Sequence, residues 1–426
     1  MEKTTKYTLV NVATGREFED SGWLLEDKES NENTLVRTKY AKKQISVGDM
    51  EMGIYRFADW LPINHTLKGS AAPVTYKSKA LAEHLGLKNL YITFSGYYPE
   101  IGAAMKTCSF KETEAYSVCG RLPKGEKRSL VVASAGNTAR AFAKVCSQNN
   151  ISLILCVPED NKNALWFDEP INNCVKLYTT EKGSDYFDAI NLSNIIAEDE
   201  AFLPEGGAKN VARRDGMATT MLSATNFIGE IPQYYFQAIG SGTGAIAAWE
   251  ANIRLLEDGR FGNRKTKMIL SQNAPFLPMY NAWKAASRAM LHYDDDQARK
   301  DVEIIEAKVL SNRKPPYPII GGVFDALCDC KGDIVAIQNE SAAKAGRLFE
   351  KLEGIDIHPA AAVAVESLIK SVEKGDVEKD AIIMINITGG GEKRFMSEKK
   401  VSYLQPNYVF KKDATKEEIL KIVKGC

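Results

Sequence analysis

The fold is decided by the stretch YYFQAIGSGTG, residues 234–244, in which a mostly apolar run leads into three alternating glycines. The aromatic and apolar residues 234–239 are typical of a buried strand, and residues 245–256 have the spacing of an amphipathic helix. A strand, a tight glycine turn and a helix in succession form half of a βαβ unit. The sequence therefore predicts an α/β fold built outward from this unit.

Strand-like and helical runs alternate on both sides of this unit. We expect strands at 130–133, 153–157, 175–178, 268–270, 334–337 and 381–387, and helices at 139–145, 185–198, 341–352 and 361–372. The runs form two sets, which predicts two open, doubly wound sheets joined by a glycine-rich, charged crossover at 205–216. The expected division is an N-terminal segment at 1–50, a larger domain at 51–105 and 225–426, and a smaller domain at 106–224.

The composition argues against several classes of function. Lys+Arg and Asp+Glu number 55 each, so no basic surface for nucleic acid or an anionic membrane is indicated. No apolar stretch approaches the length of a membrane span. The eight cysteines and four histidines lack the spacing of metal ligands. We therefore expect reduced thiols, no metal site and a cytoplasmic protein.

Ligands of open α/β sheets bind beyond the carboxyl ends of the strands, and the first candidate turn there is SAGNT at 134–138. Its small residues leave backbone N–H groups open to an anion, and Asn137 can hydrogen-bond a phenolate-like oxygen. An ordinary capped turn fits the segment equally well.

The second candidate turn is the glycine stretch 240–244. Its amides can surround a phosphate at a helix N-terminus, with the hydroxyls of Ser241 and Thr243 as further donors. A dinucleotide site would need Gly-x-Gly-x-x-Gly and an acid after the next strand, whereas residues 271–273 are Ser-Gln-Asn. One isolated phosphate fits better, and a purely structural turn stays open. The third turn places Thr388 after the strand at 381–387.

A lysine directly ahead of a helical run is the candidate nucleophile. Lys111 precedes the helical residues 112–116, and Ser109 with Glu112 has the spacing of a capping box. Lys111 is therefore expected in the first helical turn, where the helix dipole favours the neutral amine that a Schiff base with an aldehyde requires. Taken alone, the tripeptide 109–111 also fits a surface lysine.

The lysine, the asparagine turn, the glycine turn and the final threonine occur together in the order of the fold-type II pyridoxal-phosphate enzymes, and as a group they resemble that family. The resemblance implies a tryptophan synthase β-like fold, with pyridoxal 5'-phosphate in the interdomain cleft. It implies that Lys111 is catalytic and binds the cofactor. The other implied cofactor-binding residues are Asn137, Gly240, Ser241, Gly242, Thr243, Gly244 and Thr388. The implied substrate-binding residues are Ser134, Gly136 and Thr138.

Within this family the chain is similar to the threonine synthase branch at residues 33–40 and 358–364. It departs from that branch at Glu112-Thr113, where threonine synthases have Asp-Arg, and at His358, where they have Glu. The run SFKETEA at 109–115 instead resembles the cysteate synthase family of methanogens. This resemblance implies a β-replacement in which sulfite displaces phosphate from O-phospho-L-serine. The implied product is L-cysteate for coenzyme M biosynthesis, with Lys111 as general base.

Two alternatives stay open: a threonine synthase acting on O-phosphohomoserine, and a non-catalytic protein that binds the cofactor. Lys209, Arg213 and Arg214 are candidates to receive the substrate phosphate or sulfite, although a solvated helix face is the favoured interpretation of this charge run. The side chains at 271–280 are expected to influence substrate length. The resemblance also implies a homo-oligomer.

Overall fold

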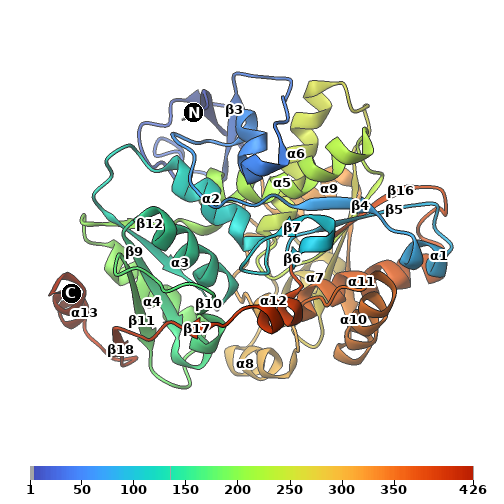
Figure 1. Ribbon diagram of the computed structural model, residues 1–426. Coiled ribbons are helices and arrows are strands. Elements are labelled where there is room, and N and C mark those ends of the chain that lie inside the picture. Colours follow the sequence, from blue (N-terminus) through green and yellow to red (C-terminus); the bar gives the residue numbers. More distant parts are fainter. Residues whose placement is uncertain (1–3, 135, 426) are drawn as a thin grey trace.

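The computed structural model describes residues 4–134 and 136–425, and two mainly parallel sheets with helices on both faces dominate it (Figure 1). In the larger sheet of six strands, only β4 is antiparallel to its neighbour. The strands in spatial order are β15 (Asp333–Ile337), β14 (Lys267–Asn273), β13 (Tyr234–Ala238), β16 (Ile382–Ile387), β5 (Asn89–Phe94) and β4 (Val74–Lys77).

Strand β13 lies inside this sheet and is buried along its whole length. Its alternate side chains serve two cores: Tyr235 packs with helices of one face, and Tyr234 and Phe236 pack with helices of the other. One core contains α5 (Val211–Ile228), α6 (Thr243–Asp258) and α9 (Val323–Cys330); the other contains α1 (Ala80–Leu85), α10 (Asn339–Glu353) and α11 (Pro359–Glu373). This double covering explains why the strand is mostly apolar and why its one amide, Gln237, is bonded inside the sheet to Asn386.

The smaller sheet has five parallel strands and follows the same plan. Its spatial order is β12 (Phe202–Pro204), β8 (Ser129–Ala133), β9 (Leu153–Pro158), β11 (Val175–Thr180) and β18 (Tyr408–Phe410). Helices α2 (Lys111–Arg121) and α3 (Asn137–Asn149) share a core on one face, and α4 (Tyr186–Ala197) and α13 (Lys416–Gly425) share a core on the other. The prediction of two doubly wound sheets is confirmed.

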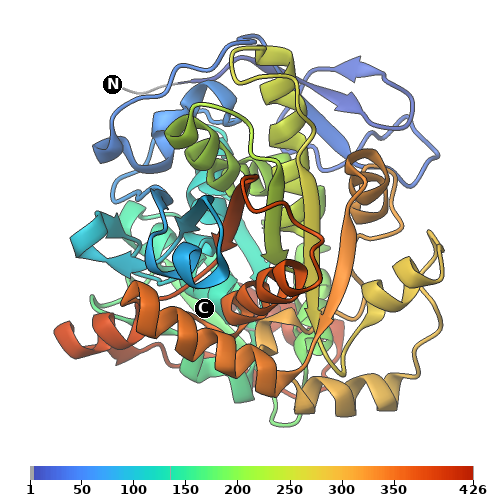
Figure 2. The same ribbon diagram turned by 90° about the vertical axis from the view of Figure 1, so that its right-hand side faces the viewer.

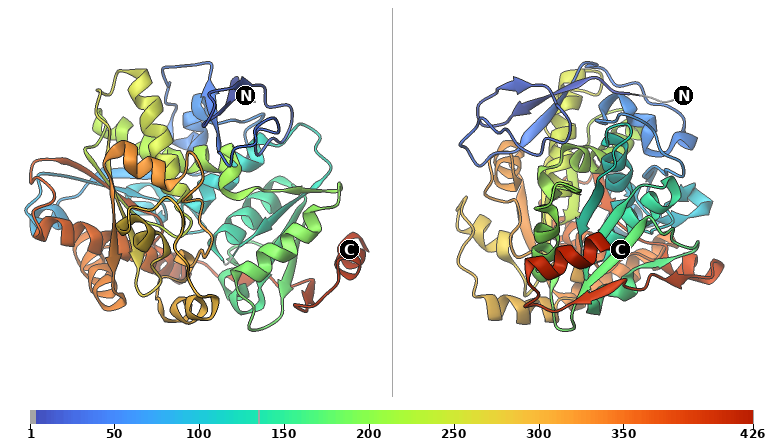
Figure 3. Two further views of the ribbon diagram at one scale, coloured as in Figure 1. Left: turned by 180° about the vertical axis from the view of Figure 1, so that it is seen from behind. Right: turned by 90° about the vertical axis from the view of Figure 1, so that its left-hand side faces the viewer.

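The last strand does not lie where the expected boundaries put it. Those boundaries assigned residues 225–426 to the larger domain, but β18 pairs with β11 of the smaller sheet, and α13 packs on α4 (Figure 3). Tyr408 stands opposite Tyr178 in this pairing. Strand β18 has only three residues, two of them exposed, and is too short to show a period in the sequence. The remaining domain boundaries stay a prediction.

The N-terminal segment, which the sequence left unassigned, contains a small antiparallel sheet at the top of the molecule in Figure 2. Its strands are β1 (Tyr7–Asn11), β2 (Glu17–Phe18) and β3 (Val36–Tyr40). Strand β3 alternates buried and more exposed residues, and the hydroxyls of its buried Thr38 and Tyr40 donate to Asp215 of α5.

The crossover expected at 205–216 is correct only in its first half. A short helical turn, η4 (Gly207–Lys209), ends at Asn210, whose side chain caps α5 by accepting from the Ala212 N–H at 3.0 Å. The residues from Val211 onward are a buried helix. The charged residues at the start of α5 predict an exposed loop. In the structure these charges are paired inside the protein, and the sequence alone does not show that pairing.

The remaining elements are short or lie in the connections. They are η1 (Met50–Trp60), β6 (Tyr97–Tyr98), η2 (Pro99–Ile101), β7 (Ala103–Ala104), η3 (Glu159–Ala164), β10 (Trp166–Phe167), α7 (Pro278–Lys284), α8 (Asp295–Ile304), η5 (Lys308–Leu310), α12 (Glu392–Glu398) and β17 (Ser402–Tyr403). Among the described residues, no helix combines the length and the apolar character needed to cross a membrane.

Candidate active site

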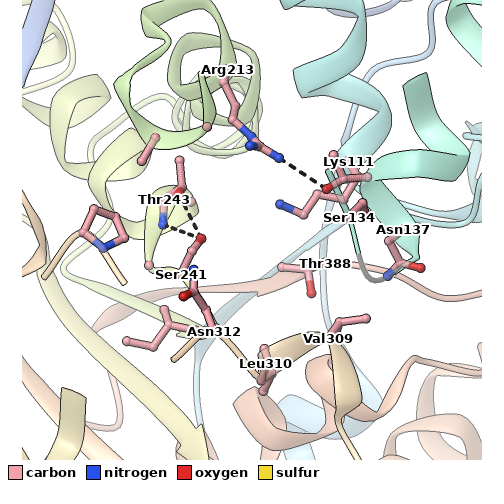
Figure 4. Close-up of a pocket in the computed structure, with 18 of the residues that line it drawn as sticks. Lys111, Ser134, Asn137, Arg213, Ser241, Thr243, Val309, Leu310, Asn312 and Thr388 are labelled. Atoms are coloured by element: carbon pink, nitrogen blue, oxygen red, sulfur yellow. Dashed lines mark hydrogen bonds between the residues drawn. The ribbon is translucent and has the colours of Figure 1, made fainter. Parts of the chain in front are cut away.

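A cavity of about 410 Å³ lies where residues that follow β13 and β16 of the larger sheet face residues that follow β8 of the smaller one. All the site residues expected from the sequence line it, as Figure 4 shows for those it labels. They are Lys111, Ser134, Gly136, Asn137, Thr138, Gly240, Ser241, Gly242, Thr243, Gly244 and Thr388. Ala135 lies outside the described residues. The cavity therefore lies beyond the carboxyl ends of the strands, where ligands of open α/β sheets are expected to bind.

Backbone pairing places Lys111 beside the end of β16. The Phe110 N–H donates to the Thr388 carbonyl at 2.9 Å, and the Gly390 N–H donates to the Cys108 carbonyl at 3.1 Å. Helix α2 then begins at Lys111, as expected. The lysine and the threonine therefore reach the cavity from adjoining segments.

The predicted capping box is wrong. The Oε2 atom of Glu112 accepts from the N–H and the hydroxyl of Thr107, at 3.1 and 2.8 Å, instead of turning back to Ser109. The Ser109 Oγ accepts from the Lys111 N–H at 3.3 Å. Glu112 also pairs with Lys144 at 2.8 Å, so its main partners come from outside its own helix.

Burial is the leading cause that lowers the pKa of Lys111. Its Nζ lies 3.1 Å from the Glu114 Oε2, and this carboxylate raises the pKa, whereas the nearby Arg213 guanidinium lowers it. The net direction is downward, which enlarges the neutral fraction of the amine. The expected direction therefore agrees with the structure, but the leading cause is burial and not the helix dipole.

Glu114 is held by a buried arginine. The Arg213 Nε and Nη2 atoms donate to the two Glu114 oxygens at 3.1 and 2.8 Å, and Nη1 donates to Glu205 at 2.9 Å. The Thr138 hydroxyl adds a bond to Glu114 at 2.9 Å. Burial raises the pKa of Glu114, but the attraction of Arg213 and Lys111 outweighs it and holds this pKa at about 2.

These contacts contradict the interpretation of residues 209–214 as a solvated, charged helix face. Arg213 and Arg214 are buried, and Arg214 pairs with Glu250 at 2.9 Å. Only Lys209 is substantially exposed, and it pairs with Glu26 at the surface. The nitrogens of Arg213 are already engaged by two carboxylates, so this residue is part of the cavity wall and not an open anion receptor.

The glycine turn joins β13 to α6 and opens on the cavity. Gly242 has φ +78°, and a Cβ there would lie 2.4 Å from the side chain of Val323, so glycine is required. The hydroxyls of Ser241 and Thr243 lie 2.8 Å apart at the start of the 16-residue α6 (Figure 4). An N-terminus of this kind, with hydroxyl donors beside it, suits an anion.

The asparagine turn joins β8 to α3. Gly136 has φ +150°, and its N–H donates to the Ser134 Oγ at 3.0 Å. The Asn137 Oδ1 accepts from Arg140 at 3.0 Å, which leaves the amide NH₂ of Asn137 as the donor for a ligand. This orientation suits an oxygen acceptor on a bound ring.

Sequence reasoning missed one wall of the cavity. None of the residues 271–280 lines it; residues 309–312, Lys314, Pro316 and Ile319 do so instead. They belong to an irregular connection that carries no periodic signal. His358 also lines the cavity, and its Nε2 lies 2.9 Å from the Glu392 Oε2.

Known proteins resemble the chain along most of its length. It is 46% identical to the cysteate synthase of Methanosarcina mazei, over 98% of this chain and 100% of that protein. It is 50% identical to the cysteate synthase of Methanocella paludicola, over 87% of each.

Two solved structures share the fold at low identity. Diaminopropionate ammonia lyase from Escherichia coli superposes with a TM-score of 0.59 at 14% identity, covering 93% of this chain and 97% of that one. Maize serine racemase superposes with a TM-score of 0.57 at 12% identity, covering 76% and 91%. The family model described as pyridoxal-phosphate dependent enzyme matches residues 74–389. The chain belongs to the pyridoxal-phosphate dependent enzyme family.

Proposed function

We propose that the chain is a cysteate synthase that replaces the phosphate of O-phospho-L-serine with sulfite. The Cβ–O bond breaks, a Cβ–S bond forms, and the products are L-cysteate and inorganic phosphate. The observation that carries the proposal is the 46% identity to a cysteate synthase along the whole length of that relative. The departures from threonine synthases at Glu112-Thr113 and His358 support the same choice.

The cavity fits pyridoxal phosphate by the chemistry of its donors. In this proposal Lys111 would hold the aldehyde carbon, the 240–244 turn would hold the phosphate, Asn137 would donate to the ring oxygen and Thr388 would bond the ring nitrogen. The bound cofactor supplies an electron-withdrawing ring that makes the Cα proton of an attached amino acid acidic. A neutral hydroxyl at the ring nitrogen favours rapid loss of a β leaving group over transamination.

The residues of the chain then position the substrate and move one proton. The turn of Ser134, Gly136 and Thr138 holds the substrate carboxylate. The Lys111 amine takes the Cα proton and returns it after sulfite has added. Glu114, 3.1 Å from the amine, orients it and stabilises the ammonium while it carries the proton.

The proposal is tested by assaying the holoenzyme with O-phospho-L-serine, with and without sulfite. We expect cysteate and phosphate in equal amounts when sulfite is present. O-phosphohomoserine is the parallel substrate. Threonine formed from it, without cysteate from phosphoserine, would identify a threonine synthase. A visible cofactor band without turnover of either substrate would identify a non-catalytic cofactor-binding protein.

Replacing Glu114 with glutamine is expected to shift the pH dependence of cofactor capture to lower pH. The Glu114 carboxylate raises the pKa of Lys111, so without it burial and Arg213 lower that pKa further. The rate at which the apoprotein develops its cofactor band rises with the neutral amine. Its pH midpoint should therefore lie below 10.5 in the unmodified protein and lower still in the variant.

Glu112→Gln is the matched control. Glu112 is a buried carboxylate of the same helix, but it bonds Thr107 and Lys144 and does not contact Lys111. The midpoint should stay in place in this variant. Equal shifts in both variants would show that Glu114 acts only through the general stability of α2.

We also propose that the enzyme is a cytoplasmic homo-oligomer. The described cysteines are all free, which suits a reducing compartment. The proposed substrates are small molecules, and dimers are common in the family that the sequence resembles. Light scattering of the purified protein tests the oligomeric state, and a monomeric mass would reject it.

A further inference from the structure

The proposed reaction brings two oxyanions to the cavity besides the phosphate of the cofactor. O-phospho-L-serine carries a phosphoryl group, and sulfite must approach the carbon that this group leaves. Both anions need a cation or several donors on the side of the cavity where the β carbon lies. A site for these anions is needed only if the proposed function holds.

The cavity wall carries four lysine or arginine side chains, and three of them are already paired. Lys111 contacts Glu114, Arg213 is engaged by Glu114 and Glu205, and Lys209 pairs with Glu26. The fourth is Lys314, and the described residues provide it with no carboxylate partner. Its charge is therefore available to a ligand.

Lys314 lies on a segment that bridges the two sides of the cavity. Residues 309–316, here called the strap, begin within η5, beside the larger sheet, and contact the start of α4, which belongs to the smaller sheet's side of the cavity. The Arg313 guanidinium donates to Asp185 at 2.8 Å, and Asp185 caps α4. The Lys314 Nζ lies 4.7 Å from the centre of the Phe187 ring. These contacts hold the lysine at the mouth of the cavity.

Neighbouring strap residues add uncharged donors. Ser311 and Asn312 line the same cavity, and the Asn312 Oδ1 accepts from the Lys314 N–H at 2.9 Å. This bond leaves the amide NH₂ of Asn312 as a donor (Figure 4 labels this residue on the wall). A charge with nearby N–H and O–H groups matches an oxyanion that must enter and leave.

We propose that Lys314 binds the phosphoryl group of the amino-acid substrate and then the incoming sulfite, with Ser311 and Asn312 as accessory donors. The strap is in this view the part of the chain that selects a substrate with an anionic leaving group and an anionic nucleophile. It takes the role that the sequence had offered to Lys209, Arg213 and Arg214.

Lys314→Met tests the proposal, because methionine keeps the length of the side chain and removes its charge. With saturating pyridoxal phosphate, we expect the KM values for O-phospho-L-serine and for sulfite each to rise about 10- to 100-fold, the usual effect of losing a charged hydrogen bond. The dependence of kcat/KM on salt should become shallower. Lys314→Arg, which keeps the charge, should retain most of the affinity.

The matched control is Lys300→Met on α8, an exposed lysine outside the cavity wall, which should leave both KM values unchanged. A cofactor titration separates the two phosphates. If Lys314→Met weakens the binding of pyridoxal phosphate and leaves both KM values at the unmodified level, Lys314 belongs to the cofactor and the proposal is overturned. Unchanged KM values together with unchanged cofactor binding overturn it as well.

Direct binding of inorganic phosphate to the holoenzyme, measured by calorimetry, separates this inference from the proposed function. Phosphate is preferred as the probe because sulfite also adds to aldehydes. If the unmodified protein makes no cysteate but binds phosphate in a way that Lys314→Met weakens, the proposed function fails and the anion site stands. If the protein makes cysteate and phosphate binding is the same in both forms, the anion site fails alone.

Discussion

Replacing Lys111 with alanine is expected to remove the cofactor absorbance near roughly 410 nm and to lower kcat on the order of 1000-fold or more. The amine has two proposed tasks, attachment of the cofactor and transfer of the Cα proton, and alanine can perform neither. The backbone bond from Phe110 sets its position beside Thr388. Absorbance spectra and initial rates of cysteate formation measure the two losses.

Lys209→Ala is the matched control, because Lys209 also lines the cavity but pairs with Glu26 at the surface. This variant should keep the absorbance band. Borohydride reduction of the unmodified holoenzyme, followed by peptide mass spectrometry, should place the cofactor on Lys111. A label on Lys209 or Lys314 would contradict the assignment.

Replacing Arg213 with methionine is expected to lower the free energy of unfolding by about 3–5 kcal/mol. The guanidinium makes two bonds to Glu114 and one to Glu205, and all three side chains are at least nine-tenths buried. Removing it leaves two carboxylates inside the protein without their main cation. Urea unfolding at neutral pH, followed by circular dichroism, measures the loss.

The loss of stability in Arg213→Met should be smaller at low pH than at neutral pH. In the unmodified protein the pKa of Glu114 is about 2, below its usual 4.5, so its contribution to stability is complete above pH 4.5 and is lost as the pH falls toward 2. In the variant, the attraction of Arg213 no longer offsets the effect of burial on the Glu114 carboxylate. Protonation of Glu114 then removes the cost of keeping a charged carboxylate inside the protein. The difference in stability should therefore shrink as the pH is lowered from 7.

Arg264→Met removes a half-buried arginine that lies 3.6 Å from the half-exposed Glu230 and donates to the Ile231 carbonyl at 3.2 Å, and it should cost about 1 kcal/mol. Adding Glu114→Gln to Arg213→Met should recover part of the stability, because it removes one of the stranded charges. A purely additive loss in the double variant would show that the arginine matters for its packing and not for its charge.

The parts of the fold that the sequence predicts are those with local causes. The sequence of β13 predicts a buried strand, because helices cover both faces of that strand and its residues are mostly apolar. Gly242 predicts a turn, because its own backbone has a positive φ. The site residues follow from the same logic, since turns after parallel strands converge at one edge of a sheet. Lys111 and Thr388 are more than 250 positions apart in the sequence, and only this rule brings them together.

The missed features depend on partners that are distant in the sequence. Glu112 has the spacing of a capping residue, but Thr107 and Lys144 satisfy its carboxylate instead. The sequence predicts a solvated side chain for Arg213, because it does not show that Glu114, almost 100 positions away, is its partner. The strap has no periodicity, because its shape is set by contacts such as that between Arg313 and Asp185.

The pairing of β18 with β11 has a consequence for how the protein is made. During synthesis β8, β9, β11 and β12 leave the ribosome well before β18, so the smaller sheet waits with the edge of β11 unpaired while the larger sheet is still being synthesised. An open strand edge is a template for other chains, and Tyr408–Phe410 later covers residues 178–180 of this one. The smaller sheet is therefore completed only after the larger one has been synthesised, and until then residues 178–180 of β11 stay open to other chains.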